Sequence, residues 1–222
     1  MKNQKTLLRT ACLALIVTLL ATAALCFAGC SKEPAKVDMT EIAKEINSLK
    51  TTDFEESSST TEYVRITVKN HGDIVLRLRE DIAPETVKNF RKLVSEKFYD
   101  GLTFHRVIPG FMIQGGDPNG NGTGSTTPVK GEMTANGFEN NLTHIRGVLS
   151  MARRGGDYNS GSCQFFICNA DAPHLNGEYA SFGYVVAGME TVDSISAVAT
   201  NAANNAPTES VVMEKVCFVK QK

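Results

Sequence analysis

Apolar and polar residues alternate with a period of two along residues 63–78, on both sides of a short polar turn. The apolar positions are Val64, Ile66 and Val68 before the turn, and Ile74, Leu76 and Leu78 after it. The turn, Asn70-His71-Gly72-Asp73, contains residue types that favour chain reversal. Alternation is typical of strands with one buried face, so this segment predicts a β-hairpin.

Two later segments have the spacing of amphipathic helices. Residues 85–97 follow Pro84, which is well suited to the first position of a helix. Their apolar side chains form one stripe, made of Val87, Phe90, Leu93 and Val94. A second helical pattern precedes the last apolar segment of the chain and consists of Met189, Val192 and Ile195. We therefore expect two α-helices.

Short apolar runs separated by Gly, Asn and Pro make up most of the remaining chain. They span residues 102–108, 111–114, 147–152, 164–168, 181–186 and 211–219. Many short strands with two helices are typical of a closed antiparallel barrel and not of a parallel α/β sheet. The pattern thus predicts one mainly β domain over residues 63–222.

The N-terminus has the layout of an export signal. Three basic residues precede an uncharged, Leu- and Ala-rich run that ends at Ala28-Gly29-Cys30. This ending resembles the bacterial lipobox, in which the cysteine is lipidated and becomes the mature N-terminus, although Phe27 stands where that motif usually has Leu. We expect residues 1–29 to be a signal peptide that is removed, and Cys30 to anchor the protein to a membrane, outside the cytoplasm. The alternative is an uncleaved transmembrane anchor, because the run approaches the ~20 residues that span a bilayer.

Residues 30–62 differ in composition from the segments on either side, with many Lys, Glu, Ser and Thr residues. Such a stretch buries too little apolar surface to offset the entropy lost on ordering, so we expect a flexible tether. Within it, Ile42, Ile46 and Leu49 fall at helical spacing, which is compatible with a short helix over residues 40–50.

Charge and cysteine content exclude several classes of function. The 222 residues carry a formal net charge of -1, which gives no basis for nucleic-acid binding. Three of the six cysteines lie within residues 1–30, which leaves Cys163, Cys168 and Cys217. An odd set without CxxC or paired His spacing indicates neither a disulfide framework nor a metal site. We expect Cys168 and Cys217, which lie in apolar runs, to be buried free thiols.

The segment with the most distinctive chemistry is FHRVIPGFMIQGGDPNGNGTG, residues 104–124. It places the guanidinium of Arg106 shortly before three apolar residues, 111–113, which the amide Gln114 follows directly. Such a combination can hold a small apolar ring and present one strong hydrogen-bond donor to an uncharged polar group. The glycine-rich end lacks the GK[ST] sequence and the following helix of a phosphate-binding loop, so we interpret it as structural.

Four motifs occur in a characteristic order: residues 104–124, GFENNLTHIRGVLSMA (137–152), QFFI (164–167) and LNGEYASFG (175–183). Together they resemble the cyclophilin family of peptidyl-prolyl cis-trans isomerases. The resemblance implies a closed eight-stranded antiparallel barrel capped by two α-helices. It also implies an enzyme that needs no cofactor and no metal and acts on proline-containing segments of unfolded or folding proteins, here exported ones. We further expect a monomer.

The resemblance implies roles for particular residues. Arg106 would be the catalytic guanidinium and Gln114 an amide that positions the substrate. The proline pocket would consist of Phe111, Met112, Phe166 and Leu175, and the groove beside it would be lined by Ala152, Arg153 and Gln164. Two positions depart from the family pattern. His174 stands where many relatives have Trp, and Tyr179, which can still supply a flat wall to the pocket, stands where many have His.

An arginine beside an apolar pocket suits this reaction. Rotation about an X-Pro bond must break amide resonance, at a barrier of ~18–20 kcal/mol, but no covalent bond is made or cut. The prolyl nitrogen becomes pyramidal in the twisted state, and a permanently charged guanidinium can donate to its lone pair. Four alternatives stay open. Arg106 forms a surface ion pair, the apolar residues are simply core, Gln164 only satisfies a loop, or the domain binds Pro-containing segments without isomerising them.

Overall fold

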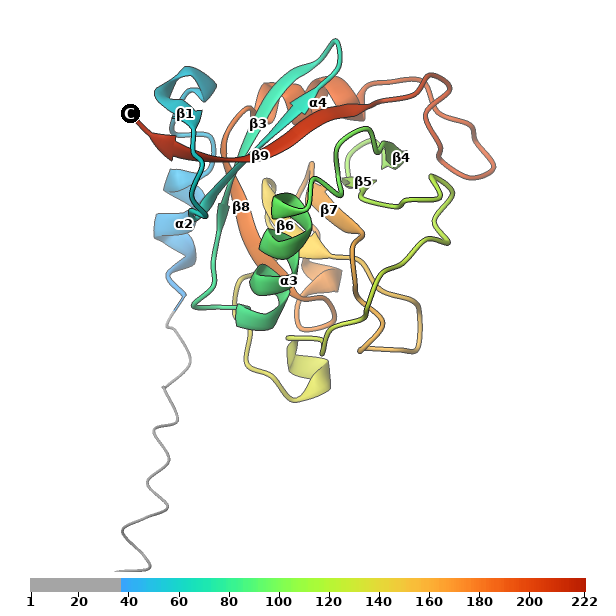
Figure 1. The fold of residues 1–222 in the computed structure, drawn as a ribbon. Coiled ribbons are helices and arrows are strands. Elements are labelled where there is room, and N and C mark those ends of the chain that lie inside the picture. The colour runs from blue at the N-terminus through green and yellow to red at the C-terminus, as the bar shows by residue number, and fades with distance from the viewer. Residues whose placement is uncertain (1–36) are drawn as a thin grey trace, which may run out of the picture. The chain divides into compact units, whose positions relative to one another are not determined.

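An antiparallel sheet of nine strands is the framework of residues 37–222, the part of the chain that this computed structural model describes (Figure 1). The strand order is β1-β9-β2-β3-β8-β6-β7-β5-β4. The strands are β1 Phe54–Glu56, β2 Tyr63–Val68, β3 Gly72–Leu78, β4 Phe104–Ile108, β5 Met112–Gly115, β6 Val148–Met151, β7 Phe165–Cys168, β8 Ser181–Ala187 and β9 Met213–Gln221. The hairpin predicted over residues 63–78 is confirmed as β2 and β3. The expected signal peptide, residues 1–29, and the expected lipidation site, Cys30, lie outside the described residues.

The sheet folds back so that its last strand, β4, meets β9 near the opposite edge, without a continuous ladder. One isolated bridge pairs Thr103 with Val212, and the amide of Met213 donates to the carbonyl of Leu102 at 2.8 Å. The structure therefore confirms a mainly β, antiparallel fold but does not confirm a closed barrel. The described sheet has nine strands where eight were expected, because β1 adds to the edge of β9.

Three α-helices occur in the described residues: α2 Met39–Glu45, α3 Pro84–Ser95 and α4 Met189–Ser196. Short 3₁₀ helices are η1 Thr51–Asp53, η2 Thr134–Asn136 and η3 Pro173–Leu175. The two predicted helices correspond to α3 and α4, and the predicted stripe of α3 is buried. Ala83 offers no side-chain cap to α3, and the buried carboxylate of Glu132 accepts the amides of Glu85 and Thr86 at 3.0 and 2.8 Å instead. The loop between β5 and β6 is thereby tied to the start of the helix.

The main core lies between the inner face of the sheet and the helices α3 and α4. Phe90 of α3 meets the rings of Tyr99, Phe165 and Phe182 at centroid distances of 5.1, 5.6 and 5.3 Å. Successive residues of a strand point to opposite faces, so the same strands also project side chains outward. Two smaller apolar clusters lie on that outer face. The N-terminal segment covers the first, and the second belongs to the candidate site.

Residues 37–56, which we call the N-terminal strap, are folded against the outer face of the sheet. β1 pairs with the end of β9, with Phe54 opposite Gln221 (Figure 1). Ile42 of α2 and Phe54 are 3% and 2% exposed. The prediction of a flexible tether over residues 30–62 is therefore wrong for the strap. The short helix expected at residues 40–50 is present as α2, Met39–Glu45, and is shorter than expected.

Contacts distant in the sequence explain why the polar composition of the strap was misleading. The hydroxyl of Tyr184 donates to the carboxylate of Glu45, and Arg77 joins Glu45 to Glu62 at 2.7 and 2.8 Å. The strap has few apolar side chains, but they pack against apolar side chains of the sheet. The composition of the strap alone does not show these distant partners, so it underestimates how much apolar surface the strap buries.

We expect Phe54→Ala to lower the free energy of unfolding by about 3 kcal/mol, because it removes a buried ring from the contact between strap and sheet. Urea denaturation followed by circular dichroism measures this. Glu55→Ala is the matched control, since its exposed side chain pairs only with Lys220 among the described residues, and it should change stability by less than about 0.5 kcal/mol. If Phe54→Ala were as stable as the wild type, the strap would not be docked in solution.

Candidate active site

One row of side chains crosses four neighbouring strands on the outer face of the sheet. Arg106 of β4 lies opposite Gln114 of β5, Gln114 lies opposite Phe166 of β7, and Phe166 lies opposite Ser150 of β6. Residues directly opposite each other in an antiparallel pair point to the same face. Strand register therefore brings together the guanidinium, the amide and one aromatic residue of the expected site.

A β-bulge at His105 turns Arg106 toward this outer face. Phe104 pairs with Gly115, and Arg106 pairs with Gln114, so two steps along β4 correspond to one step along β5. Without the bulge, Phe104 and Arg106 would point to the same face. With it, Phe104 is fully buried in the main core and Arg106 faces the candidate site.

An apolar cavity of about 310 Å³ lies at this row. Met112, Phe166 and Leu175 are 1%, 5% and 7% exposed and form one apolar cluster in its lining, with Leu175 supplied by η3. Every residue expected in the site lines this cavity except Gln164, and His174 lines it in addition. The dimensions suit a small apolar ring with a polar group at its edge.

Most hydrogen-bond donors of Arg106 have no partner among the described residues and face the cavity. Its Nη1 donates to Oε1 of Gln114 at 3.1 Å. No carboxylate within residues 37–222 forms an ion pair with Arg106, whereas Arg77, Arg79 and Arg146 each pair with an acid. A guanidinium has five N–H donors, so several remain for a ligand. The described residues give no support to the alternative that Arg106 is a surface ion-pair partner.

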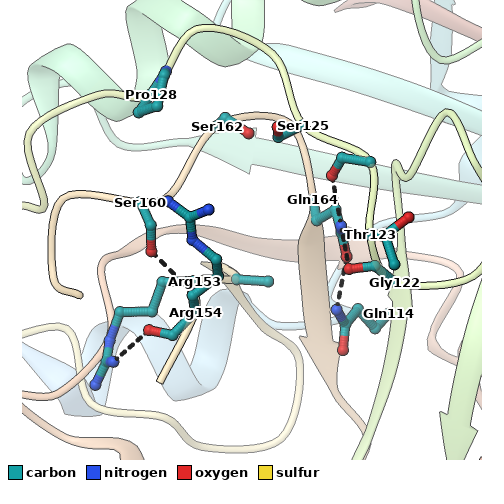
Figure 2. Close-up of a pocket in the computed structure, with 12 residues that line it drawn as sticks. Gln114, Gly122, Thr123, Ser125, Pro128, Arg153, Arg154, Ser160, Ser162 and Gln164 are labelled. Carbon is teal, nitrogen blue, oxygen red and sulfur yellow. Dashed lines mark hydrogen bonds between the residues drawn. The ribbon is translucent and has the colours of Figure 1, made fainter. Parts of the chain in front are cut away.

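A second, more polar cavity of about 400 Å³ adjoins the first and shares Gln114, Ala152 and Arg153 with it. Figure 2 shows Gln114 and Gln164 on one side of this cavity and Arg154 with Ser160 on the other. Gln164 thus lies in the groove beside the apolar cavity, where the sequence placed it. Its binding role stays a prediction, as do those of Ala152 and Arg153.

Arg153 lines both cavities and connects the segments that border them. Its guanidinium lies between the rings of Tyr158 and Tyr179, 4.6 Å from each centroid. Nε and Nη2 donate to the carbonyl and carboxylate oxygens of Glu178 at 2.9 and 3.3 Å, and the side chain is 8% exposed. Tyr179 in turn packs edge-on against Phe166, with the centroids 5.7 Å apart. The charge of Arg153 is therefore used within the protein, through a cation–π contact that no sequence motif revealed.

Two histidines complete the surroundings of the cavity, and the sequence argument assigned a site role to neither. The ring of His174 lies 5.3 Å from that of Phe111, and both line the cavity. Its position directly before Leu175, where many relatives have Trp, could have indicated this. His144 is outside the lining but stacks on Phe166, with the centroids 6.0 Å apart at an interplanar angle of 19°. His144 lies within the motif of residues 137–152, but nothing in that motif indicates that its ring stacks on Phe166.

Hydrogen bonds select the tautomer of His144, and burial keeps its ring neutral. Oδ1 of Asn176 accepts the backbone amide of His144 at 2.7 Å, so it also accepts from the ring Nδ1 at 3.1 Å. Nε2 is then left to accept the hydroxyl of Ser150 at 2.9 Å. Burial lowers the pKa of this histidine from 6.5 to about 4. The ring ties β6 to the turn after Leu175 and so supports the cavity from behind.

The cysteines of the domain supply no activated nucleophile. Cys168 lies in the apolar cluster of the cavity, is fully buried and free, and burial raises its pKa to about 12. The expectation of a buried free thiol is confirmed for Cys168. It is wrong for Cys217, which is free but only half-buried. A thiol with a raised pKa remains protonated at neutral pH and is a poor nucleophile.

We expect His144 to make the fold sensitive to mild acid. Its pKa is about 4 in the folded chain and near 6.5 when unfolded, so its contribution to stability is complete above pH 6.5 and is lost as the pH falls toward 4. That difference amounts to about 3 kcal/mol. Urea denaturation at several pH values from 7 to 4 should show a smaller loss of stability for His144→Gln than for the wild type. The carboxylates are common to both proteins, so parallel curves would contradict this role of His144.

Comparisons with known proteins place these features in context. A family model described as cyclophilin type peptidyl-prolyl cis-trans isomerase/CLD matches residues 63–217. Peptidyl-prolyl cis-trans isomerase B of Bacillus subtilis is 49% identical over 130 residues, which cover 58% of this chain and 87% of that protein. The protein of the same name from Escherichia coli is 44% identical over 160 residues, which cover 66% of this chain and 94% of that protein.

A solved structure shares both fold and sequence with the chain. It is a cyclophilin type peptidyl-prolyl cis-trans isomerase of Cryptosporidium parvum, crystallised in the presence of the dipeptide Ala-Pro. The TM-score is 0.65 and the identity 32%, over 70% of this chain and 98% of that one. The family model spans the whole row from Arg106 to Phe166 and both cavities. The chain therefore belongs to the cyclophilin-type peptidyl-prolyl cis-trans isomerase family.

Proposed function

We propose that the chain isomerises X-Pro bonds in the apolar cavity and that Arg106 stabilises the twisted prolyl nitrogen. The class of activity follows from the family. The role of Arg106 rests on one observation: a guanidinium without an ion pair among the described residues borders an apolar cavity of about 310 Å³. That is the arrangement needed to donate a strong hydrogen bond to a neutral acceptor.

The proposed hydrogen bond acts selectively on the transition state. In the planar amide the nitrogen lone pair is delocalised into the carbonyl group and accepts hydrogen bonds poorly. As the bond twists, the lone pair leaves conjugation and becomes an acceptor. A donor aimed at the nitrogen therefore binds the twisted state more tightly than either planar isomer, which is the condition for catalysis.

The surroundings of Arg106 strengthen this interaction. Met112, Phe166 and Leu175 would hold the prolyl ring in an apolar environment, where an electrostatic contact is stronger than in water. Gln114 restrains the guanidinium through its Oε1 before any substrate arrives. Orientation is then fixed in advance and does not have to be established during the reaction.

The proposed hydrogen bond can supply only part of the rate enhancement. A hydrogen bond from a charged donor contributes ~1.5–3 kcal/mol, which corresponds to roughly a tenfold to hundredfold change in rate. Any further acceleration comes from holding the ring while the preceding carbonyl swings. A domain that only bound proline would have no need of a charged donor at this place, which favours the isomerase over the pure binding module.

The substrates we propose are proline-containing segments of unfolded or folding proteins. The cavity lies on the outer face of the sheet, and the adjoining polar cavity gives room for residues next to the proline. The solved relative was crystallised with Ala-Pro, a dipeptide of this class.

We further propose that Cys30 anchors a monomeric protein outside the cytoplasm, where it acts on exported proteins. The support is the basic start of the chain, the uncharged run and the Ala-Gly-Cys ending. Within residues 37–222, no helix combines the length and the apolar character needed to cross a membrane. Fatty-acid labelling that persists in Cys30→Ser would contradict the lipid anchor, and a dimer in sedimentation equilibrium would contradict the monomer.

We expect Arg106→Ala to lower kcat for an Ala-Pro peptide at least tenfold, because it removes the proposed donor and leaves the cavity in place. A protease-coupled or NMR assay of the isomerisation rate measures this. Arg91→Ala is the matched control. Arg91 lies on α3, pairs with Glu80 and lines neither cavity, so this variant also removes a guanidinium but leaves the candidate site unchanged. Unchanged kcat in Arg106→Ala would remove this mechanism, whatever the activity of the control.

A further inference from the structure

The loop after β5 is organised by one buried carboxylate. Asp117 is 1% exposed, and its oxygens accept the backbone amides of Asn119 and Asn121 at 2.9 Å each, and that of Gly122. A carboxylate can only accept hydrogen bonds, so in all three bonds the loop amide is the donor and Asp117 is the acceptor. The loop lies directly on Asp117: a Cβ atom added to Gly124 would be 1.9 Å from Oδ1 of Asp117.

The loop carbonyls determine how Gln164 is turned. Its Nε2 donates to the carbonyls of Gly122 and Gly124 at 3.2 and 2.8 Å (Figure 2). A carbonyl can only accept, so the amide must present its nitrogen to the loop and its oxygen away from it. The flipped amide would set oxygen against two carbonyl oxygens.

The orientation of Gln164 fixes the orientation of Gln114, and Gln114 in turn accepts a hydrogen bond from Arg106. Oε1 of Gln164 accepts from Nε2 of Gln114 at 3.0 Å, and Oε1 of Gln114 accepts from Nη1 of Arg106 at 3.1 Å. The chain of bonds begins at acceptors, the loop carbonyls, and ends at a donor, the guanidinium. Each amide therefore has one permitted orientation, and a change at the loop can be transmitted to the arginine.

We propose that Asp117 is a positioning residue for catalysis, which sets the orientation of Arg106 through the loop and the two glutamine side chains. Asp117 lines neither cavity and touches no substrate in this arrangement. If its hold on the loop is weakened, Gln164 and Gln114 are free to rotate, and Arg106 loses the fixed acceptor that aims it. The inference rests on the proposed role of Arg106.

A double-mutant cycle tests this inference. The variants are Asp117→Asn, Arg106→Ala and the double variant, assayed as full chains with an Ala-Pro peptide. Asn has one side-chain acceptor oxygen in place of two and no charge, so it cannot hold all three amides equally well. We expect Asp117→Asn to lower kcat about three- to tenfold with KM nearly unchanged, and to have no further effect once Arg106 is absent.

A purely structural role gives a different result in the same cycle. If Asp117→Asn lowers kcat by the same factor with and without Arg106, or leaves kcat of the wild type unchanged, the inference is overturned and the proposed function stands. If Arg106→Ala retains full activity, the proposed function itself fails, and the inference falls with it. The two failures are therefore distinguishable.

Two further proteins keep the test decisive. Asp81→Asn removes a carboxylate that accepts two bonds from Arg79 outside both cavities, so it should lose stability without losing kcat. If Asp117→Asn does not fold, Gln164→Met interrupts the same chain one step nearer to Arg106 and should show the same dependence on it. The side-chain amide resonances of Gln114 should also shift in Asp117→Asn, and unchanged resonances would overturn the inference without reference to activity.

Discussion

The pairing of β5 with β4 on one side and β7 on the other is the constraint on which the site depends. It sets Gln114 between Arg106 and Phe166 on the outer face. The same strands bury Val107, Ile113 and Ile167 on the inner face. A slip of one residue would exchange the faces and send these apolar side chains into water. Burial of the inner face thus fixes the strand register, and the register places the side chains of the candidate site next to one another.

Local pattern was sufficient for the elements whose partners are near in the sequence. The β2–β3 hairpin and helix α3 follow from periods of two and of 3.6 residues, because a half-buried strand or helix must show one apolar face. The grouping of Arg106, Phe111, Met112 and Gln114 was also accessible, since they lie within one short stretch that matches a family motif. Their proposed roles remain predictions, although their proximity is now a feature of the structure.

Features that depend on distant partners could not be read from the sequence. β1 pairs with the end of β9, more than a hundred residues away. Because of this pairing, the N-terminal strap is folded against the sheet and is not the flexible tether that its composition predicted. The stacking of Arg153 between Tyr158 and Tyr179 needs three separate positions to converge. The incomplete ladder between β4 and β9 depends on how the sheet folds back, which no local period encodes. In each case tertiary contacts decided what composition and spacing left open.

Catalysis of this kind makes few chemical demands and strict geometrical ones. The apolar cavity, the donor and the bonds that orient the donor come from different segments, and buried polar groups such as Asp117 and His144 connect them. The most direct test of this view is exchange NMR of an Ala-Pro peptide with a catalytic amount of the protein. We predict cis-trans exchange far faster than the uncatalysed time of tens to hundreds of seconds. A peptide that binds, as shown by its shifted resonances, but still exchanges at the uncatalysed rate would contradict it and identify a binding module.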